Sequence, residues 1–299
     1  MLLGGVQIPA AVISAWEEGR LVLFTGAGVS MAAPSDLPSF LGLAKEVAER
    51  LQSPLNPTSM QWTSQLDTFM DVLDQGEGAD VHGHVKRIVT RDGSLPNLNH
   101  DALARIATKF TTRVVTTNYD RHLEGRLREY ENPEHPLEVF RAPAMPLGHD
   151  FEGLVYLHGS AQDDARRLVV TDRDFSGAYF HSAWAARFLE RMFHEYVVLF
   201  VGYSHSDVVM KYLGLGLGPK AQRYVLTDKP DDAIWDRLLI TAVEYPEGEH
   251  EALTRCLVAW ADHGDRGLLD HRQRIRELVS TAAEPDPDEL SYLEDSLRR

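Results

Sequence analysis

One stretch constrains the fold of this chain more than any other: Leu21 to Ser30, which reads LVLFTGAGVS. An unbroken apolar run is typical of a parallel strand that is buried on both faces. The Gly-x-Gly that follows allows a tight turn and a close approach to a phosphate, and a helix after the turn would direct its N-terminus at the anion. The same pattern also serves as a plain tight turn, so a nucleotide site needs support from the rest of the chain.

Further apolar segments predict the other strands of a parallel sheet. These segments are 113–117, 154–157, 167–171, 197–201, 223–226 and 240–245. Amphipathic patterns between them, such as 181–196 and 249–263, predict helices. The alternation is typical of an α/β fold with a Rossmann-like, doubly wound parallel sheet.

The segment 52–100 differs from its surroundings, because it contains helix-like pieces and two prolines but no good strand. We interpret it as a helical insertion between the first and second strands. We expect one catalytic, nucleotide-binding domain over residues 1–265, followed by a C-terminal helix and acidic tail over 266–299.

Composition excludes several classes of protein. A net charge of −15 disfavours a broad nucleic-acid-binding face. The single cysteine, Cys256, cannot build an internal disulfide or a multi-cysteine zinc site, and its apolar surroundings indicate a packing residue. We find neither a basic-then-apolar leader nor an apolar run of about 20 residues, so we expect a cytoplasmic protein that does not span a membrane.

Ligands of doubly wound sheets bind outside the carboxyl ends of the strands. This rule selects the segments 26–30, 118–120, 158–160, 202–207 and 227–228. No G-x-S-x-G or Walker sequence occurs, and Met31 stands where a dehydrogenase fingerprint would have its third glycine. Hydrolase triads, P-loop chemistry and hydride transfer are therefore disfavoured.

Three polar residues at the expected strand ends suit catalysis. Asn118 would hold a water or a ribose hydroxyl, although asparagine there also caps helices. Asp120 would bind a ribose or an amide, or it is a first-turn acid favoured by the helix dipole. His158, before a glycine, suits proton transfer near neutral pH. His82 and His84 have no cysteine nearby, so we expect no metal site.

Five motifs in one order resemble the sirtuin superfamily over about residues 20–265. TGAGVS is similar to the sirtuin nucleotide turn, and TTNYD stands where sirtuins have Gln-Asn-Ile-Asp. LHG matches the sirtuin His-Gly. GYSHSD and YVLTDKP resemble the two stretches that meet the adenosine part of NAD. The resemblance implies NAD as the substrate.

Two departures distinguish this chain from sirtuin deacylases. DLPSF followed by Leu41 replaces the usual Gly-Ile-Pro-Asp-Phe-Arg, so the aspartate and the arginine are both missing. One cysteine cannot form the four-cysteine zinc module that frames the acyl-lysine cleft. The chain looks closer to bacterial sirtuin-like NAD hydrolases of anti-phage defence. That resemblance implies cleavage of the nicotinamide–ribose bond, which would deplete NAD and abort infection.

The resemblance also assigns roles to residues of this chain. It implies catalysis by Asn118, His158 (as general base) and Asp120. It implies NAD binding by Gly26, Ala27, Gly28, Ser30, Phe40, Thr117, Gly202, Ser204, Asp207 and Thr227. We expect a homo-oligomer, and a second defence protein as a partner is compatible with the pattern. A deacylase that lacks zinc and a catalytically silent NAD or ADP-ribose sensor stay open as alternatives.

Overall fold

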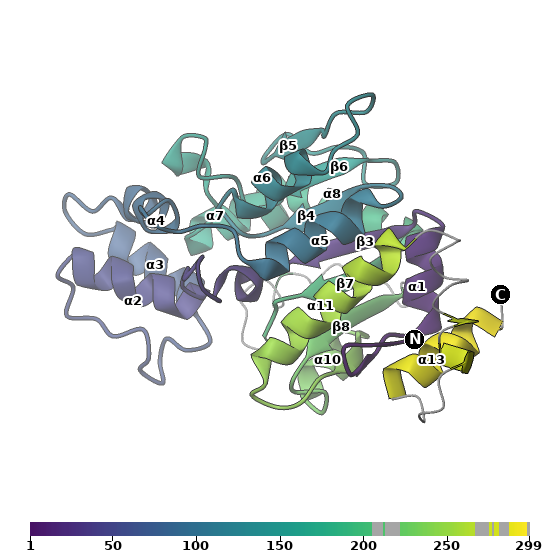
Figure 1. The fold of residues 1–299 in the computed structure, drawn as a ribbon. Coiled ribbons are helices and arrows are strands. Elements are labelled where there is room, and N and C mark those ends of the chain that lie inside the picture. The colour runs from purple at the N-terminus through teal and green to yellow at the C-terminus, as the bar shows by residue number, and fades with distance from the viewer. Residues whose placement is uncertain (205–211, 213–221, 267–274, 277, 281–286, 298–299) are drawn as a thin grey trace.

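The computed structural model describes residues 1–204, 212, 222–266, 275–276, 278–280 and 287–297 (Figure 1). Its centre is a seven-stranded parallel sheet with the order β5-β6-β4-β3-β7-β8-β9. The strands are β3 (Leu21–Thr25), β4 (Arg113–Thr116), β5 (Val139–Arg141), β6 (Gly153–Tyr156), β7 (Val197–Val201), β8 (Arg223–Thr227) and β9 (Thr241–Glu244). The predicted Rossmann-like α/β fold is confirmed.

The apolar run of the first motif is the central strand β3, in which every residue is buried. β4 pairs with it on one side and β7 on the other. The chain therefore builds one half of the sheet before β7 and the other half from β7 onward. A switch point of this kind leaves a crevice outside the carboxyl ends of the central strands.

Helices cover both faces of the sheet. From β3, Val22 and Phe24 enter one core while Leu21 and Leu23 enter the other. The first core is covered by α2 (Phe40–Arg50), α3 (Leu66–Asp74), α4 (Val81–Val89), α7 (Asp172–Ser176), α8 (Trp184–Glu195) and α10 (Ala233–Arg237). The second is covered by α1 (Ala10–Glu17), α5 (Leu98–Thr108), α6 (His122–Glu129) and α11 (His250–Asp265). The buried Cys256 of α11 belongs to the second core.

The predicted helical insertion lies between β3 and β4, and its helices α3 and α4 extend the molecule at one end (Figure 1). The insertion is tied to α7 by two polar contacts. His82 Nε2 lies 2.8 Å from Asp174 Oδ2, and Arg173 Nε lies 2.9 Å from Asp71 Oδ1. Phe175 of α7 lines the site described below, so the insertion supports one wall of that site.

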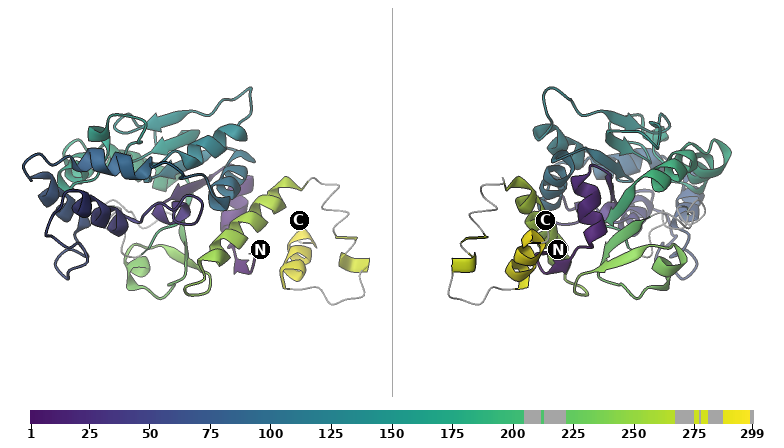
Figure 2. Two further views of the ribbon diagram at one scale, coloured as in Figure 1. Left: turned by 60° about the vertical axis from the view of Figure 1, so that its left-hand side comes forward. Right: turned by 90° about the vertical axis from the view of Figure 1, so that its right-hand side faces the viewer.

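A short hairpin at the N-terminus lies beside the last described helix (Figure 2). Its strands are β1 (Leu2–Leu3) and β2 (Val6–Gln7), which pair antiparallel around two glycines. The backbone N–H of Leu2 donates to Ser291 Oγ of α13 (Pro287–Leu297) at 2.8 Å. The expected helix over 271–282 falls largely outside the described residues.

Two sequence-based expectations about strands were wrong. The apolar segment 167–171 is not a strand: Leu168 to Val170 are buried without regular structure, and Thr171 caps α7. The Thr171 hydroxyl accepts from Asp174 N, while the Asp174 carboxylate accepts from Thr171 N. This capping box turns the chain into a helix at the point where a strand was predicted. Conversely, β5 was missed, because it is a short, half-buried edge strand.

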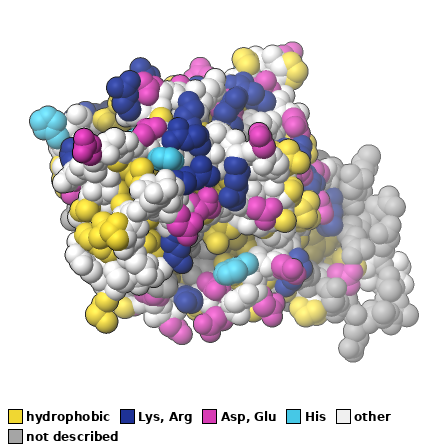
Figure 3. All heavy atoms as spheres, turned by 90° about the vertical axis from the view of Figure 1, so that its left-hand side faces the viewer, with side chains coloured by type: hydrophobic (Ala, Val, Ile, Leu, Met, Phe, Trp, Pro, Cys, Tyr) yellow, Lys and Arg dark blue, Asp and Glu magenta, His cyan; other side chains and the backbone are white. Residues whose placement is uncertain are grey.

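The face over the insertion carries a band of Lys and Arg side chains among acidic ones (Figure 3). Several arginines of the insertion have acidic partners. Arg91 lies 3.4 Å from Glu46 and Arg87 lies 3.3 Å from Asp80. In the part of the chain that the structure describes, no helix is long and apolar enough to cross a bilayer.

Candidate active site

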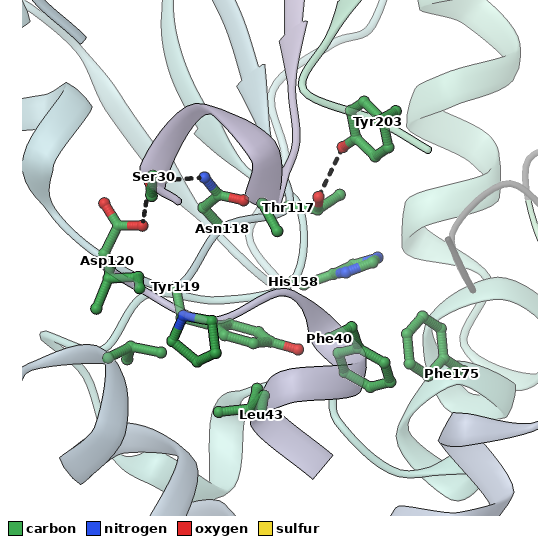
Figure 4. A pocket seen from close by; sticks show the side chains of 14 residues that line it. Ser30, Phe40, Leu43, Thr117, Asn118, Tyr119, Asp120, His158, Phe175 and Tyr203 are labelled. Atoms are coloured by element: carbon green, nitrogen blue, oxygen red, sulfur yellow. Dashed lines mark hydrogen bonds between the residues drawn. The ribbon is translucent and has the colours of Figure 1, made fainter. Parts of the chain in front are cut away.

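Two hollows meet at the turn after β3. The first, which we term the Asn118 cavity, is lined by Ala27, Ser30, Leu37, Pro38, Phe40, Leu43, Val89, Thr117, Asn118, Tyr119, Asp120, His158, Phe175 and Tyr203 (Figure 4). The second, the Asp228 pocket, is lined by Ala27, Gly28, Met31, Ala32, Ser39, Asn99, Gly202, Tyr203, Ser204, Asp228, Tyr245, His250, Glu251, Leu253 and Thr254. Because both linings include Ala27 and Tyr203, the hollows are neighbours along the strand ends.

The turn itself is packed backbone to backbone against the end of β7. Gly28 N donates to Gly202 O at 2.9 Å, and Gly26 N donates to Val201 O at 2.9 Å. A Cβ on Gly28 would lie 2.8 Å from the Gly202 Cα, which explains why the position needs glycine. These two N–H groups are therefore already used within the protein.

The helix expected after this turn is present but short. It is a four-residue 3-10 helix, Ala27–Ser30, and α2 begins only at Phe40. Its brevity limits any dipole at its N-terminus, because the macrodipole is a sum over aligned peptide units. A bound phosphate would depend on individual polar groups of the two hollows rather than on a helix end.

Asn118 is held in one orientation by its own amide group. Its Nδ2 donates to Gly26 O at 3.1 Å and to Ser30 Oγ at 3.3 Å. A carbonyl oxygen only accepts, so the nitrogen must face Gly26. The side-chain oxygen of Asn118 has no hydrogen-bond partner among the described residues, and the residue lines the cavity. Asn118 does not cap α6, whose N-cap is Arg121.

Ser30 joins Asn118 to two residues from other parts of the chain. Its hydroxyl donates to Asp120 Oδ2 at 3.0 Å and lies 3.0 Å from Nε2 of His100 (Figure 4 draws the first contact). The other oxygen of Asp120 accepts from His122 N at 3.0 Å. Asp120 precedes α6, its carboxylate accepts from the first N–H of that helix, and the residue lines the cavity.

His158 is a buried, neutral residue. It is 2% exposed, and burial lowers its pKa to about 3. Its Nε2 lies 2.9 Å from the Tyr179 hydroxyl, and its ring meets Phe175 edge to face at 5.1 Å. Nδ1 has no hydrogen-bond partner among the described residues. A neutral imidazole that lines a cavity can accept a hydrogen bond there, but a pKa this far below 7 makes His158 a weaker base than the sequence-based expectation of proton transfer near neutral pH supposed.

The structure brings most predicted site residues to one of the two hollows. The residues that line the Asn118 cavity are Ala27, Ser30, Phe40, Thr117, Asn118, Asp120 and His158. Those that line the Asp228 pocket are Gly28, Gly202 and Ser204. Gly26 contributes its carbonyl to Asn118. The Thr227 hydroxyl instead accepts from Lys229 N, and its neighbour Asp228 lines the pocket. Asp207 lies outside the described residues.

Tyr203 falls in the selected segment 202–207 but was given no role, and His100 was not selected. The Tyr203 hydroxyl lies 2.6 Å from Thr117 Oγ1 and donates to Thr25 O at 3.1 Å, which closes the floor between the two hollows. Its position directly after Gly202, at a predicted strand end, was a usable signal. His100 belongs to α5, and only the Asn97-x-x-His100 spacing of a capping box marked it.

Comparison with known proteins shows a similarity to one family over part of the chain. Residues 112–216 match a family model described as "SIR2-like domain". This segment of the chain is similar to SIR2-like domains. The matched SIR2-like region contains Asn118, Asp120 and His158, and the glycine turn precedes it. SIR2-like domains use NAD. No cluster of three or more metal-ligating side chains occurs within the described residues.

A relative from Sinorhizobium fredii, "Uncharacterized protein y4cA", is 28% identical over 225 residues. The aligned segment covers 70% of this chain but 18% of that protein. The part of this relative that the chain matches is therefore less than a fifth of its length.

Because His158 is buried and neutral, we expect the protein to lose stability in mild acid. The unfolded chain binds a proton on His158 below about pH 6.5, whereas the folded chain does so only near pH 3. The free energy of unfolding should fall by about 2 kcal/mol between pH 7 and pH 5 on account of this residue. Urea unfolding of wild type and of His158→Gln at both pH values measures the difference.

The matched control is His194→Gln, because His194 is exposed on α8. That variant should keep the full wild-type decrease. An equal decrease in wild type and His158→Gln would contradict the assignment of a neutral, buried His158.

Proposed function

We propose that this protein hydrolyses NAD. Water would add to the anomeric carbon of the nicotinamide ribose, the N-glycosidic bond would break, and nicotinamide, ADP-ribose and a proton would be released. Nicotinamide leaves as a neutral molecule, so no acid is needed to protonate it. The protein must instead stabilise an oxocarbenium-like ribose and supply a positioned water.

One observation carries this proposal: the orientation of Asn118. Both hydrogens of its amide are donated within the protein, to Gly26 O and Ser30 Oγ. The side-chain oxygen remains available in the cavity that also contains His158 and Asp120. An oriented acceptor suits a water or a ribose hydroxyl, and a fixed dipole in a sheltered site needs no reorganisation during reaction.

The remaining roles follow from the two hollows. In the tautomer that carries its proton on Nε2, His158 donates to Tyr179, and Nδ1 would accept a proton from water as the general base. Asp120 would orient the ribose or the amide. The Asp228 pocket would take the adenosine part, with Ser204 beside it. Asp207 and Thr227 complete the proposed adenosine side by resemblance alone.

Hydrolysis is favoured over protein deacylation by what the chain lacks. One cysteine cannot supply the zinc module of deacylases, and Leu41 follows DLPSF where those enzymes continue to an arginine. Phe40 and Leu43 of α2 line the Asn118 cavity at this position. This apolar lining would shield an oxocarbenium-like ribose from all but a positioned water.

The biological role that we propose is depletion of NAD in anti-phage defence. The protein would act in the cytoplasm as a homo-oligomer, with a second defence protein as the activating partner. The catalytic unit would be residues 1–265, and residues 266–299 would form a C-terminal helix and tail.

The test is NAD consumption over a range of protein concentrations, with nicotinamide and ADP-ribose quantified by chromatography. We expect both products in equal amounts without any added peptide, at a specific rate that rises with concentration if assembly activates the protein. Release that requires an acylated peptide would indicate a deacylase instead. Binding of NAD without turnover at every concentration would indicate a sensor.

A further inference from the structure

His100 lies behind the site and touches neither hollow, yet its bonds reach the proposed catalytic residues. The residue is fully buried in the first turn of α5, three residues after the Asn97 cap. Its Nδ1 accepts from the backbone N–H of Asn97 at 3.1 Å. Its Nε2 lies 3.0 Å from Ser30 Oγ.

The hydrogen atoms of this network can be assigned without ambiguity. Burial lowers the pKa of His100 to about 4, so the ring is neutral at physiological pH. A backbone N–H only donates, so Nδ1 carries no proton and the ring hydrogen lies on Nε2. His100 therefore donates to Ser30. The serine hydroxyl has one hydrogen and two lone pairs, and the lone pairs accept from His100 and Asn118.

The Ser30 hydroxyl therefore donates its one hydrogen to Asp120 Oδ2, which lies 3.0 Å from Ser30 Oγ. If the His100 donor were absent, the Ser30 hydroxyl could rotate, and it could turn its hydrogen away from Asp120. The amide of Asn118 would then lose a fixed acceptor and its single orientation. The donor on His100 thus decides how two side chains of the cavity are arranged.

We infer that His100 is a positioning residue that acts through Ser30 to hold Asn118 and Asp120 in their reactive orientations. The inference rests on the proposed function for its kinetic consequence, but the hydrogen-bond assignment can be tested without turnover. A contribution of one positioning hydrogen bond, about 1–1.5 kcal/mol, corresponds to about a tenfold change in rate.

Two substitutions separate positioning from a purely structural role, because each retains one of the two His100 bonds. His100→Asn keeps an acceptor for Asn97 N but is too short to reach Ser30. His100→Gln can place its amide donor near Ser30, but in that position it no longer accepts the hydrogen bond from Asn97 N. We expect His100→Asn to lower kcat for nicotinamide release about tenfold with little change in KM, and His100→Gln to retain most of the wild-type kcat.

Thermal unfolding of both variants provides the comparison. If His100 had only a structural role, kcat would follow stability, and His100→Gln, which loses the bond from Asn97 N to the side chain at position 100, would be the poorer enzyme. A double-mutant cycle with Ser30→Ala adds a second criterion: once Ser30 is absent, His100→Asn should cause no further loss of kcat. An undiminished loss in the Ser30→Ala background would overturn the inference.

Nitrogen NMR of histidine-labelled protein makes the test independent of activity. The signals that vanish in His100→Asn belong to His100, and we expect one protonated Nε2 and one unprotonated Nδ1 at pH 7. Ser30→Ala should shift the Nε2 signal more than that of Nδ1. A charged ring, or a proton on Nδ1, would overturn the inference about His100 whether or not the wild type hydrolyses NAD. The absence of NAD hydrolysis, by itself, would reject the proposed function and not the hydrogen-bond assignment.

Discussion

Replacing His158 with alanine should lower nicotinamide release from NAD about 10²–10⁴-fold, the range typical of a lost general base. The residue lines the Asn118 cavity as a neutral imidazole, and the proposed reaction needs an acceptor for the proton of water. Asn118→Ala should have a comparable effect, because it removes the oriented side-chain oxygen. Initial rates at saturating NAD, followed by nicotinamide chromatography, measure both losses.

Stability must be separated from chemistry in these variants, since His158 is buried and alanine leaves a void. His158→Gln restores much of the volume while still lacking a base, so it should be as inactive as His158→Ala but closer to wild type in melting temperature. His194→Ala on the exposed side of α8 should be fully active. If both His158→Ala and Asn118→Ala retained wild-type rates, the assignment of the reaction to this cavity would be wrong.

The second large effect should come from Gly202→Ala. Gly202 has a φ of +74°, and an added Cβ would lie 2.6 Å from Val29 N and 2.9 Å from Val29 Cγ1. The left-handed backbone costs about 1–2 kcal/mol for alanine, and the overlap adds about 1–3 kcal/mol. Because the glycine turn and the end of β7 would be forced apart, we expect a lower melting temperature together with weaker NAD binding.

Calorimetric titration with ADP-ribose and thermal unfolding check the two consequences separately. The matched control is Gly248→Ala, which has the same φ of +74° but no atom within 4 Å of the added Cβ. That variant carries the backbone cost without the overlap, and it should bind ADP-ribose as wild type does. Equal behaviour of the two variants would refute the argument that close packing of the turn against β7 shapes the site.

Much of the fold follows from local pattern. Segments such as 21–25 and 197–201 are buried parallel strands, because four or five consecutive apolar residues leave neither face of the strand polar enough for solvent. The same criterion failed at 167–171, where Thr171 and Asp174 form a capping box that competes with strand pairing. The criterion also missed β5, because an edge strand is only partly buried and does not need a continuous apolar sequence.

The sequence by itself determined which residues stand at the strand ends, and therefore that Asn118, Asp120 and His158 line one cavity. Strand ends are local features, and parallel strands bring them to the same edge. Only the tertiary structure decided their orientation and protonation. Ser30 meets His100 across 70 residues and Asp120 across 90 residues. The burial that lowers the pKa of His158 to about 3 arises only in the folded protein, where Phe175 and Tyr179 pack against its ring.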